Sequence, residues 1–91
     1  MKEGEILKQV RDYLRWRGWK VYRIQQGLGC HRGMSDLICV KDGKVLFLEI
    51  KTPKGKLSPH QEKFRDEIQD AGNIYLWVSS LEQIRQFMGD K

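Results

Sequence analysis

The chain has 91 residues, enough for one domain, and this length excludes a second independently folded one. Hydrophobic residues make up 40% and charged residues 32%, a composition that excludes a disordered tail. Seventeen Lys and Arg against twelve Asp and Glu leave a net charge of +5, which favours an anionic partner such as nucleic acid, although many basic proteins bind nothing anionic.

The sequence shows no sign of export or of membrane insertion. Cys30 and Cys39 are too few for a disulfide framework and lack metal-site spacing. The first ten residues form a charged amphipathic pattern, and no apolar run approaches membrane-spanning length. We therefore expect a cytoplasmic protein with no membrane partner and no small-molecule cofactor.

The first predicted element is a helix over residues 2–17. Its apolar residues recur at helical spacing, and Gly18 follows where a helix C-terminus favours a left-handed residue. Residues 20–25 predict a strand. Residues 26–34 contain three glycines and predict a flexible loop that is a candidate ligand edge.

The clearest local signal is a β-hairpin over residues 35–51. Asp-Gly at 42–43 separates two apolar runs, and this dipeptide favours a two-residue turn. Counting outward from the turn pairs Asp36 with Glu49. Alternate residues of the second strand face opposite sides and both sides are largely apolar, so we expect a central strand.

Two helices and a strand complete the chain. Ser58-Pro59-His60-Gln61 has the N-cap, first-position proline and third-position glutamine of a helix start, and Gly72 ends that helix. Residues 74–78 predict a strand. Ser79-Ser80-Leu81-Glu82 predicts a second capping box, opening a helix whose inward-facing residues are Leu81, Ile84, Phe87 and Met88.

The expected fold class is α/β, of the α+β kind. We predict a single compact domain over residues 1–91 with element order αβββαβα and a mixed four-stranded sheet flanked by helices.

Asp36, Glu49 and Lys51 form the constellation that carries chemistry. If the hairpin register holds, the two carboxylates face each other and Lys51 lies two residues along the same strand face. Two carboxylates can hold a divalent cation, and an ammonium group beside them can orient water or stabilise charge on a phosphodiester. The alternative is a solvated strand end whose ion pairs contribute about 0–1 kcal/mol each. A covered strand argues against it, because burying charges without purpose is costly.

Three blocks occur in order on the expected elements: Gly33-Met34-Ser35-Asp36, Glu49-Ile50-Lys51 and Gly55-Lys56-Leu57-Ser58-Pro59-His60-Gln61. Together they resemble the VRR-NUC (virus-type replication-repair nuclease) family of the PD-(D/E)XK nuclease superfamily. The resemblance covers nearly the entire chain and implies a restriction-endonuclease-like fold in a prokaryotic, phage or viral setting. Ser35 stands where the family often has proline, which affects loop stiffness more than chemistry.

The resemblance implies a metal centre with Mg²⁺ or Mn²⁺ as cofactor. By this resemblance Asp36 and Glu49 are the metal-binding carboxylates and the backbone carbonyl of Ile50 is a further ligand. Lys51 is the catalytic lysine, and Gln61 is the site glutamine from the following helix.

Gln61 and the acidic residue of the first helix each have an ordinary structural alternative. Gln61 is also half of a capping box with Ser58, and we expect that one side-chain conformation cannot fill both roles. For the acidic residue the sequence offers Glu3 and Glu5. At about 100° per residue Glu3 lies on the apolar row facing the sheet, so we expect Glu3. Acidic residues also favour a first helical turn without any site role.

Basic residues near the expected site are candidate DNA contacts, namely Arg23, His31, Arg32, Lys54 and Lys56. Arg32 and Lys56 lie in glycine-containing loops that flank the acidic residues, where they could hold phosphates, although such loops can also be merely solvated. A single loop histidine such as His31 is more often a bystander than a catalyst, and we expect His60 on the surface of the helix start.

The sequence predicts a metal-dependent DNA endonuclease that hydrolyses phosphodiester bonds. By resemblance its substrate is branched or four-way-junction DNA in replication, repair or recombination, and its working unit is a symmetric homodimer, with Trp16 and Trp19 as interface candidates. The alternative is a non-catalytic basic DNA-binding module of the same fold, against which the intact acidic residues and lysine argue. A small interaction domain would not account for three ordered blocks.

Overall fold

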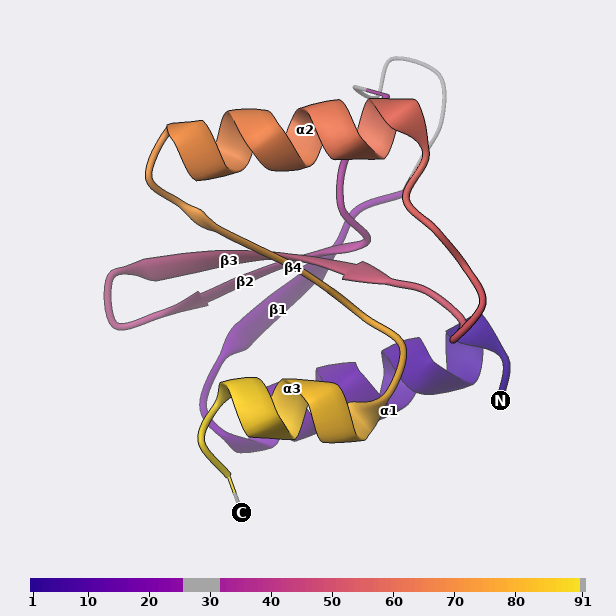
Figure 1. The fold of residues 1–91 in the computed structure, drawn as a ribbon. Coiled ribbons are helices and arrows are strands. Elements are labelled where there is room, and N and C mark those ends of the chain that lie inside the picture. The colour runs from indigo at the N-terminus through magenta and orange to yellow at the C-terminus, as the bar shows by residue number, and fades with distance from the viewer. Residues whose placement is uncertain (26–31, 91) are drawn as a thin grey trace.

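A four-stranded mixed sheet with helices on both faces organises the chain. The computed structural model describes residues 1–25 and 32–90. Its elements are α1 (Glu3–Trp16), β1 (Lys20–Arg23), β2 (Leu37–Lys41), β3 (Lys44–Ile50), α2 (Pro59–Asp70), β4 (Ile74–Val78) and α3 (Leu81–Phe87). This order confirms the predicted fold class. Figure 1 shows α1 and α3 on one face of the sheet and α2 on the other.

The strand order β1-β2-β3-β4 makes β3 an inner strand. The first three strands are antiparallel neighbours, and β4 is parallel to β3. Because α2 connects two parallel strands, it runs back across the sheet, and its first turn lies at the end where β3 stops (Figure 1). This crossover brings the start of α2 over the C-terminal end of β3.

The hairpin between β2 and β3 has the predicted turn and register. Asp42 and Gly43 have φ values of 50° and 76°, as a type I′ turn requires. Leu37 is the partner of Leu48. Asp36 precedes this pair and lies just outside β2, and its side chain reaches the end of β3, where Oδ2 accepts from the N–H of Ile50.

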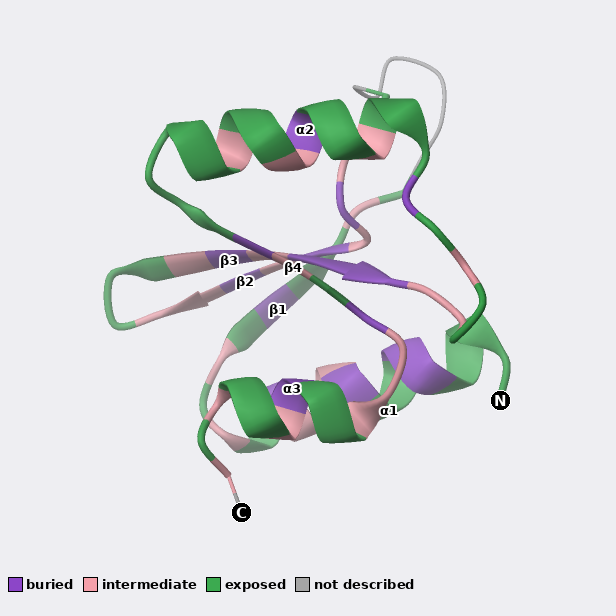
Figure 2. Cartoon of the chain, in the orientation of Figure 1, coloured by how far each residue is buried: buried purple, intermediate pink, exposed green. Residues whose placement is uncertain are grey.

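Both faces of β3 are covered. Leu46, Leu48 and Ile50 are fully buried in the main core with residues of α1 and α3, and Figure 2 shows buried residues along this strand. A second cluster lies under α2. In it Phe64 packs edge-on against Phe47 and Tyr75, with ring centroids 5.7 and 6.1 Å apart.

The C-terminus of α1 is held by a residue of the hairpin. Lys41 Nζ donates a hydrogen bond of 2.6 Å to the carbonyl oxygen of Arg17, and Gly18 follows with a φ of 93°. The lysine thus satisfies a carbonyl that the helix leaves without an internal partner.

The start of α3 differs from the prediction in two respects. The N-cap is Ser80 instead of Ser79, and its side chain accepts from the backbone N–H of Gln83. The predicted capping box is not formed, because the side chain of Gln83 accepts from the N–H of Ser79 instead of that of the N-cap residue. The two adjacent serines made either frame available to the sequence pattern. Phe87, predicted to face inward, is 47% exposed. Among the residues of this short helix, Ile84 alone is fully buried.

No helix in the described part of the chain is long and apolar enough to cross a membrane. Cys39 is a buried free thiol, and burial raises its pKa to about 12. Cys30 lies outside the described residues.

Candidate active site

Asp36 is fixed between two strands immediately before β2 begins. Its carbonyl oxygen accepts from the N–H of Ile24 at 2.8 Å, and its Oδ2 accepts from the N–H of Ile50 at 2.8 Å. The second bond ties the Asp36 carboxylate to the backbone at the end of β3. The carbonyl of Ile50 belongs to the same backbone segment.

Glu49 is a buried carboxylate, only 3% exposed. Its Oε2 accepts from Nε2 of Gln61 at 3.1 Å and lies 3.8 Å from Nζ of Lys51. Its Oε1 is buried and has no hydrogen-bond partner among the residues that the structure describes. One oxygen of this carboxylate is therefore held in place and the other is left free.

Burial is the main reason why the pKa of Glu49 rises from its ordinary value of 4.5 to about 8. The neighbouring charge of Asp36 raises this pKa further, and the ammonium of Lys51 lowers it. Glu49 is thus not part of a solvated strand end, the alternative that the sequence left open. A buried site that resists a second negative charge attracts a positive one.

Lys51 follows directly after β3 and stays aligned with the sheet, because its N–H donates to the carbonyl of Val78 at 2.9 Å. Its side chain is 18% exposed and its Nζ reaches the Glu49 carboxylate. The ammonium therefore lies at the border between the buried carboxylate and solvent.

Gln61 fills both of its predicted roles in one conformation, which corrects the expectation that they exclude each other. Its Oε1 accepts from the N–H of Ser58 at 2.9 Å, completing the capping box at the start of α2. Its Nε2 donates to Glu49 at the same time. The two roles are compatible because a primary amide has an acceptor at one end and donors at the other.

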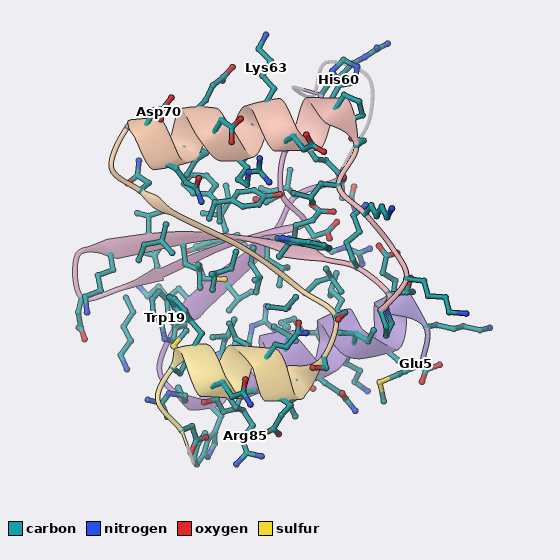
Figure 3. All side chains as sticks on the ribbon, in the orientation of Figure 1. Glu5, Trp19, His60, Lys63, Asp70 and Arg85 are labelled. Carbon is teal, nitrogen blue, oxygen red and sulfur yellow. The ribbon has the colours of Figure 1, made fainter. Side chains whose placement is uncertain are left out.

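Glu3 and Glu5 are both exposed on the first turn of α1, but their relation to the site differs. The charge of Glu3 contributes to the raised pKa of Glu49, whereas Glu5 is not among the causes of that rise. Figure 3 shows Glu5 directed away from the sheet, and Figure 1 shows the chain after β3 passing the start of α1. The choice of Glu3 over Glu5 stays a prediction, with the effect of its charge on Glu49 in its favour.

A cleft of about 310 Å³ opens beside the carboxylates. Its lining residues include Asp36, Glu49, Gln61, Arg32 and His60. Nη1 of Arg32 lies 3.5 Å from Nε2 of His60. His60 is on the surface of the helix start, as predicted, but its contact with Arg32 was not predicted, because residues 28 positions apart share no local pattern.

Gly33 allows the loop before Asp36 to pack closely against the first turn of α2. Its φ is 81°, and a Cβ at this position would lie 2.2 Å from the carbonyl oxygen of His60. Only a residue without a side chain allows this approach. Gly33 belongs to the first of the three sequence blocks, but this contact with α2 was not predicted from the block.

The other predicted DNA contacts are distributed around the carboxylates. Arg23 and Asp36 line a second cleft of about 360 Å³. Lys54 and Lys56 are exposed in the segment after β3 and line neither cleft. His31 lies outside the described residues.

A further cleft of about 380 Å³ lies at the hairpin end of the sheet, lined by residues that include Arg17, Trp19, Lys41 and Phe87. It is similar in volume to the cleft at Glu49, so size does not distinguish them. Chemistry does, because the buried carboxylate, the lysine and the second acidic residue are all at the other end.

The residues present fit a cation held by few protein ligands. No group of three or more His, Cys, Asp and Glu side chains suited to a metal occurs in residues 1–25 and 32–90. Asp36 and Glu49 nevertheless supply two hard oxygen donors, and the free buried Oε1 of Glu49 is an acceptor that has yet to be satisfied.

The sheet topology and the acidic end of β3 define a nuclease-type α/β fold. The chain belongs to the VRR-NUC family, because the model of the VRR-NUC domain matches residues 3–79. This confirms the family resemblance seen in the three sequence blocks.

Two solved structures share the fold. One, described as a VRR_NUC domain, has a TM-score of 0.85 at 24% identity, and the match covers 96% of this chain and 94% of the chain in that structure. Another, a VRR_NUC domain protein, has a TM-score of 0.80 at 15% identity, and the match covers 98% of this chain and 86% of that protein's chain.

A curated relative matches part of the chain. A UPF0102 protein of Synechococcus sp. (strain JA-3-3Ab) is 36% identical over 47 residues. These residues are 52% of this chain and 34% of that protein, so the chain spans about a third of that relative's length.

Proposed function

We propose that this chain is a Mg²⁺- or Mn²⁺-dependent deoxyribonuclease that hydrolyses phosphodiester bonds at the carboxylates of Asp36 and Glu49. The observation that carries the proposal is the free, buried oxygen of Glu49 beside a second carboxylate and a lysine. A family whose members carry a nuclease domain supports the same class of reaction.

Asp36, Glu49 and the carbonyl of Ile50 would hold the cation. When bound, the cation supplies positive charge to the phosphate oxygens and favours ionisation of a water molecule. Glu49 is suited to this role because its Oε2 is fixed by Gln61 and its Oε1 remains free. Water would attack the phosphorus atom, one P–O ester bond would break, and the leaving oxygen would receive a proton.

Lys51 would orient the attacking water or stabilise charge on the phosphate. Its position at the border between Glu49 and solvent places a permanent positive charge where a phosphate would meet the carboxylates. Gln61 would hold Glu49 in place, and Glu3 would add negative charge at the edge of the site.

Arg32, Arg23, Lys54, Lys56 and His31 would contact DNA. Arg32 supports this best, since it lines the same cleft as both carboxylates. For the other four residues, the prediction of a DNA contact rests on their proximity, in sequence or in space, to the acidic end of β3.

Branched DNA and a homodimer remain the predicted substrate and working unit. A single site cuts one strand, so paired incisions in a two-fold-symmetric junction call for two protomers with matching symmetry. A cytoplasmic setting also stays a prediction.

A cleavage panel over duplex, flap and four-way-junction DNA, with and without Mg²⁺ or Mn²⁺, tests the proposal. We expect cleavage only with a divalent cation, and its loss in Asp36→Asn, Glu49→Gln and Lys51→Ala with folding retained. Binding without cleavage by the wild type under every metal condition would instead support the non-catalytic DNA-binding module. Undiminished cleavage by Asp36→Asn would show that the site is elsewhere.

A further inference from the structure

Two buried side-chain atoms lack a hydrogen-bond partner among the described residues, and they belong to neighbouring strands. One is Oε1 of Glu49 on β3, and the other is the hydroxyl of Tyr75 on β4. Tyr75 is only 5% exposed. Buried polar atoms without partners are rare, so two of them close together require an explanation.

The strand register places both side chains on the α2 face of the sheet. Tyr75 is the partner of Phe47, and Glu49 is the partner of Trp77 two residues further along. Tyr75 is thus the diagonal neighbour of Glu49, a separation of about 7–8 Å that a tyrosine side chain can reach across.

The charges of both carboxylates act on the phenol, in agreement with the strand register. Burial raises the pKa of Tyr75, and the charges of Glu49 and Asp36 raise it further. Its hydroxyl therefore keeps its proton and is available as a hydrogen-bond donor. The free oxygen of Glu49 accepts a hydrogen bond when the carboxyl group is ionised, as it would be beside a bound cation.

Packing does not explain why this residue is tyrosine. The ring lies edge-on against Phe64 in a cluster that also contains Phe47, so phenylalanine would suit the same space. A buried hydroxyl without a partner is destabilising. A water molecule between the hydroxyl and the carboxylate would remove this cost for both groups.

We propose that Tyr75 is a positioning residue of this site, whose hydroxyl holds the free oxygen of Glu49 through one bridging water molecule and so orients the carboxylate toward a divalent cation. This inference rests on the proposed function. Groups that orient a metal-binding side chain typically change the cation affinity by about 10–100-fold when they are removed.

Tyr75→Phe tests this, because it removes the hydroxyl and keeps the ring. Tyr22→Phe is the matched control: Tyr22 lies on the same face of the sheet, on β1, but is 55% exposed. We expect Tyr75→Phe to raise the dissociation constant for Mn²⁺, measured by calorimetry, by about 10-fold. The melting temperature without metal should change little, because the ring and its packing against Phe64 are kept. Tyr22→Phe should change neither quantity.

Equal Mn²⁺ affinity in the wild type and Tyr75→Phe would overturn the inference while leaving the proposed function intact. A lower melting temperature with unchanged affinity would assign the hydroxyl a purely structural role and also overturn it. If the wild type binds no Mn²⁺, the proposed function fails and this inference fails with it.

Discussion

Glu49 makes the stability of the metal-free protein depend on pH. Its pKa is raised from 4.5 to about 8, so the folded state retains a proton that the unfolded chain releases. The contribution of Glu49 is therefore fully present below pH 4.5 and is lost as the pH rises through 8, with a slope of up to about 1.4 kcal/mol per pH unit.

We expect Glu49→Gln to lack this dependence. In the presence of a chelator, the melting temperature of the wild type should fall relative to that of Glu49→Gln as the pH rises from 4.5 to 8. Above pH 8 the difference between the two melting temperatures should stay constant. Other titrating groups act in both proteins, so the difference between the two curves isolates Glu49. Parallel curves would show that Glu49 is not buried with a raised pKa.

Glu3 and Glu5 provide an internal comparison at the start of α1. Glu3→Gln should lower cleavage activity several-fold, whereas Glu5→Gln should have little effect, because only the charge of Glu3 contributes to the raised pKa of Glu49. Both are exposed and on the same helical turn, so their effects on folding should match. Steady-state cleavage rates measure the difference, and the reverse order would refute the helical-face argument.

At the scale of elements, the contact between Gly33 and α2 controls how the loop before Asp36 meets the helix. Gly33→Ala brings a Cβ into collision with the carbonyl of His60. Gly72→Ala is the control, because Gly72 also has a positive φ, of 86°, but a Cβ there meets nothing within 4 Å. Both substitutions carry the strain of that conformation, on the order of 1–2 kcal/mol.

Gly33→Ala should therefore cost about 1–3 kcal/mol more than Gly72→Ala in the free energy of unfolding. Urea titration measures both. Since the collision displaces the first turn of α2, Gly33→Ala should also lower cleavage, while Gly72→Ala should not. Equal losses of stability would mean that the helix start moves away freely.

Sequence patterns predicted elements best where one dominant local signal was present. Asp42-Gly43 favoured a tight turn, so the register of the hairpin followed by counting. The start of α3 offered two serines as caps, and the wrong one was chosen. The contacts of Gly33 and Tyr75 could not be predicted, because they depend on how elements pack and not on any spacing within them.

At the scale of the whole molecule, exposed aromatic residues bear on assembly. Trp16 is 79% exposed, whereas Trp19 packs against the main core. Of the two predicted interface residues, Trp16 is thus the one available to a second copy.

We expect a homodimer at micromolar concentration by analytical ultracentrifugation and a shift toward monomer in Trp16→Glu. Gln9→Glu serves as a control for the added charge, because Gln9 is also an exposed, uncharged residue of α1. In the same assay a four-way junction should bind one dimer. A wild-type monomer both alone and with the junction, cutting linear duplex equally well, would contradict the dimer and the preference for branched DNA.

Gln61 hydrogen-bonds both to Ser58 at the start of α2 and to Glu49. Opening of the first turn of α2 is therefore coupled to whether the carboxylates hold a ligand. Ser58, Gln61 and Glu49 form one chain of contacts, so whatever immobilises Glu49 also restrains the first turn of α2. Thermodynamic linkage makes the effect reciprocal. Saturation of the carboxylates should slow the exchange of the Gln61 and Glu62 amide hydrogens with solvent. Conversely, Ser58→Ala, which removes the hydroxyl that accepts from the N–H of Gln61, should weaken the binding of whatever the carboxylates hold.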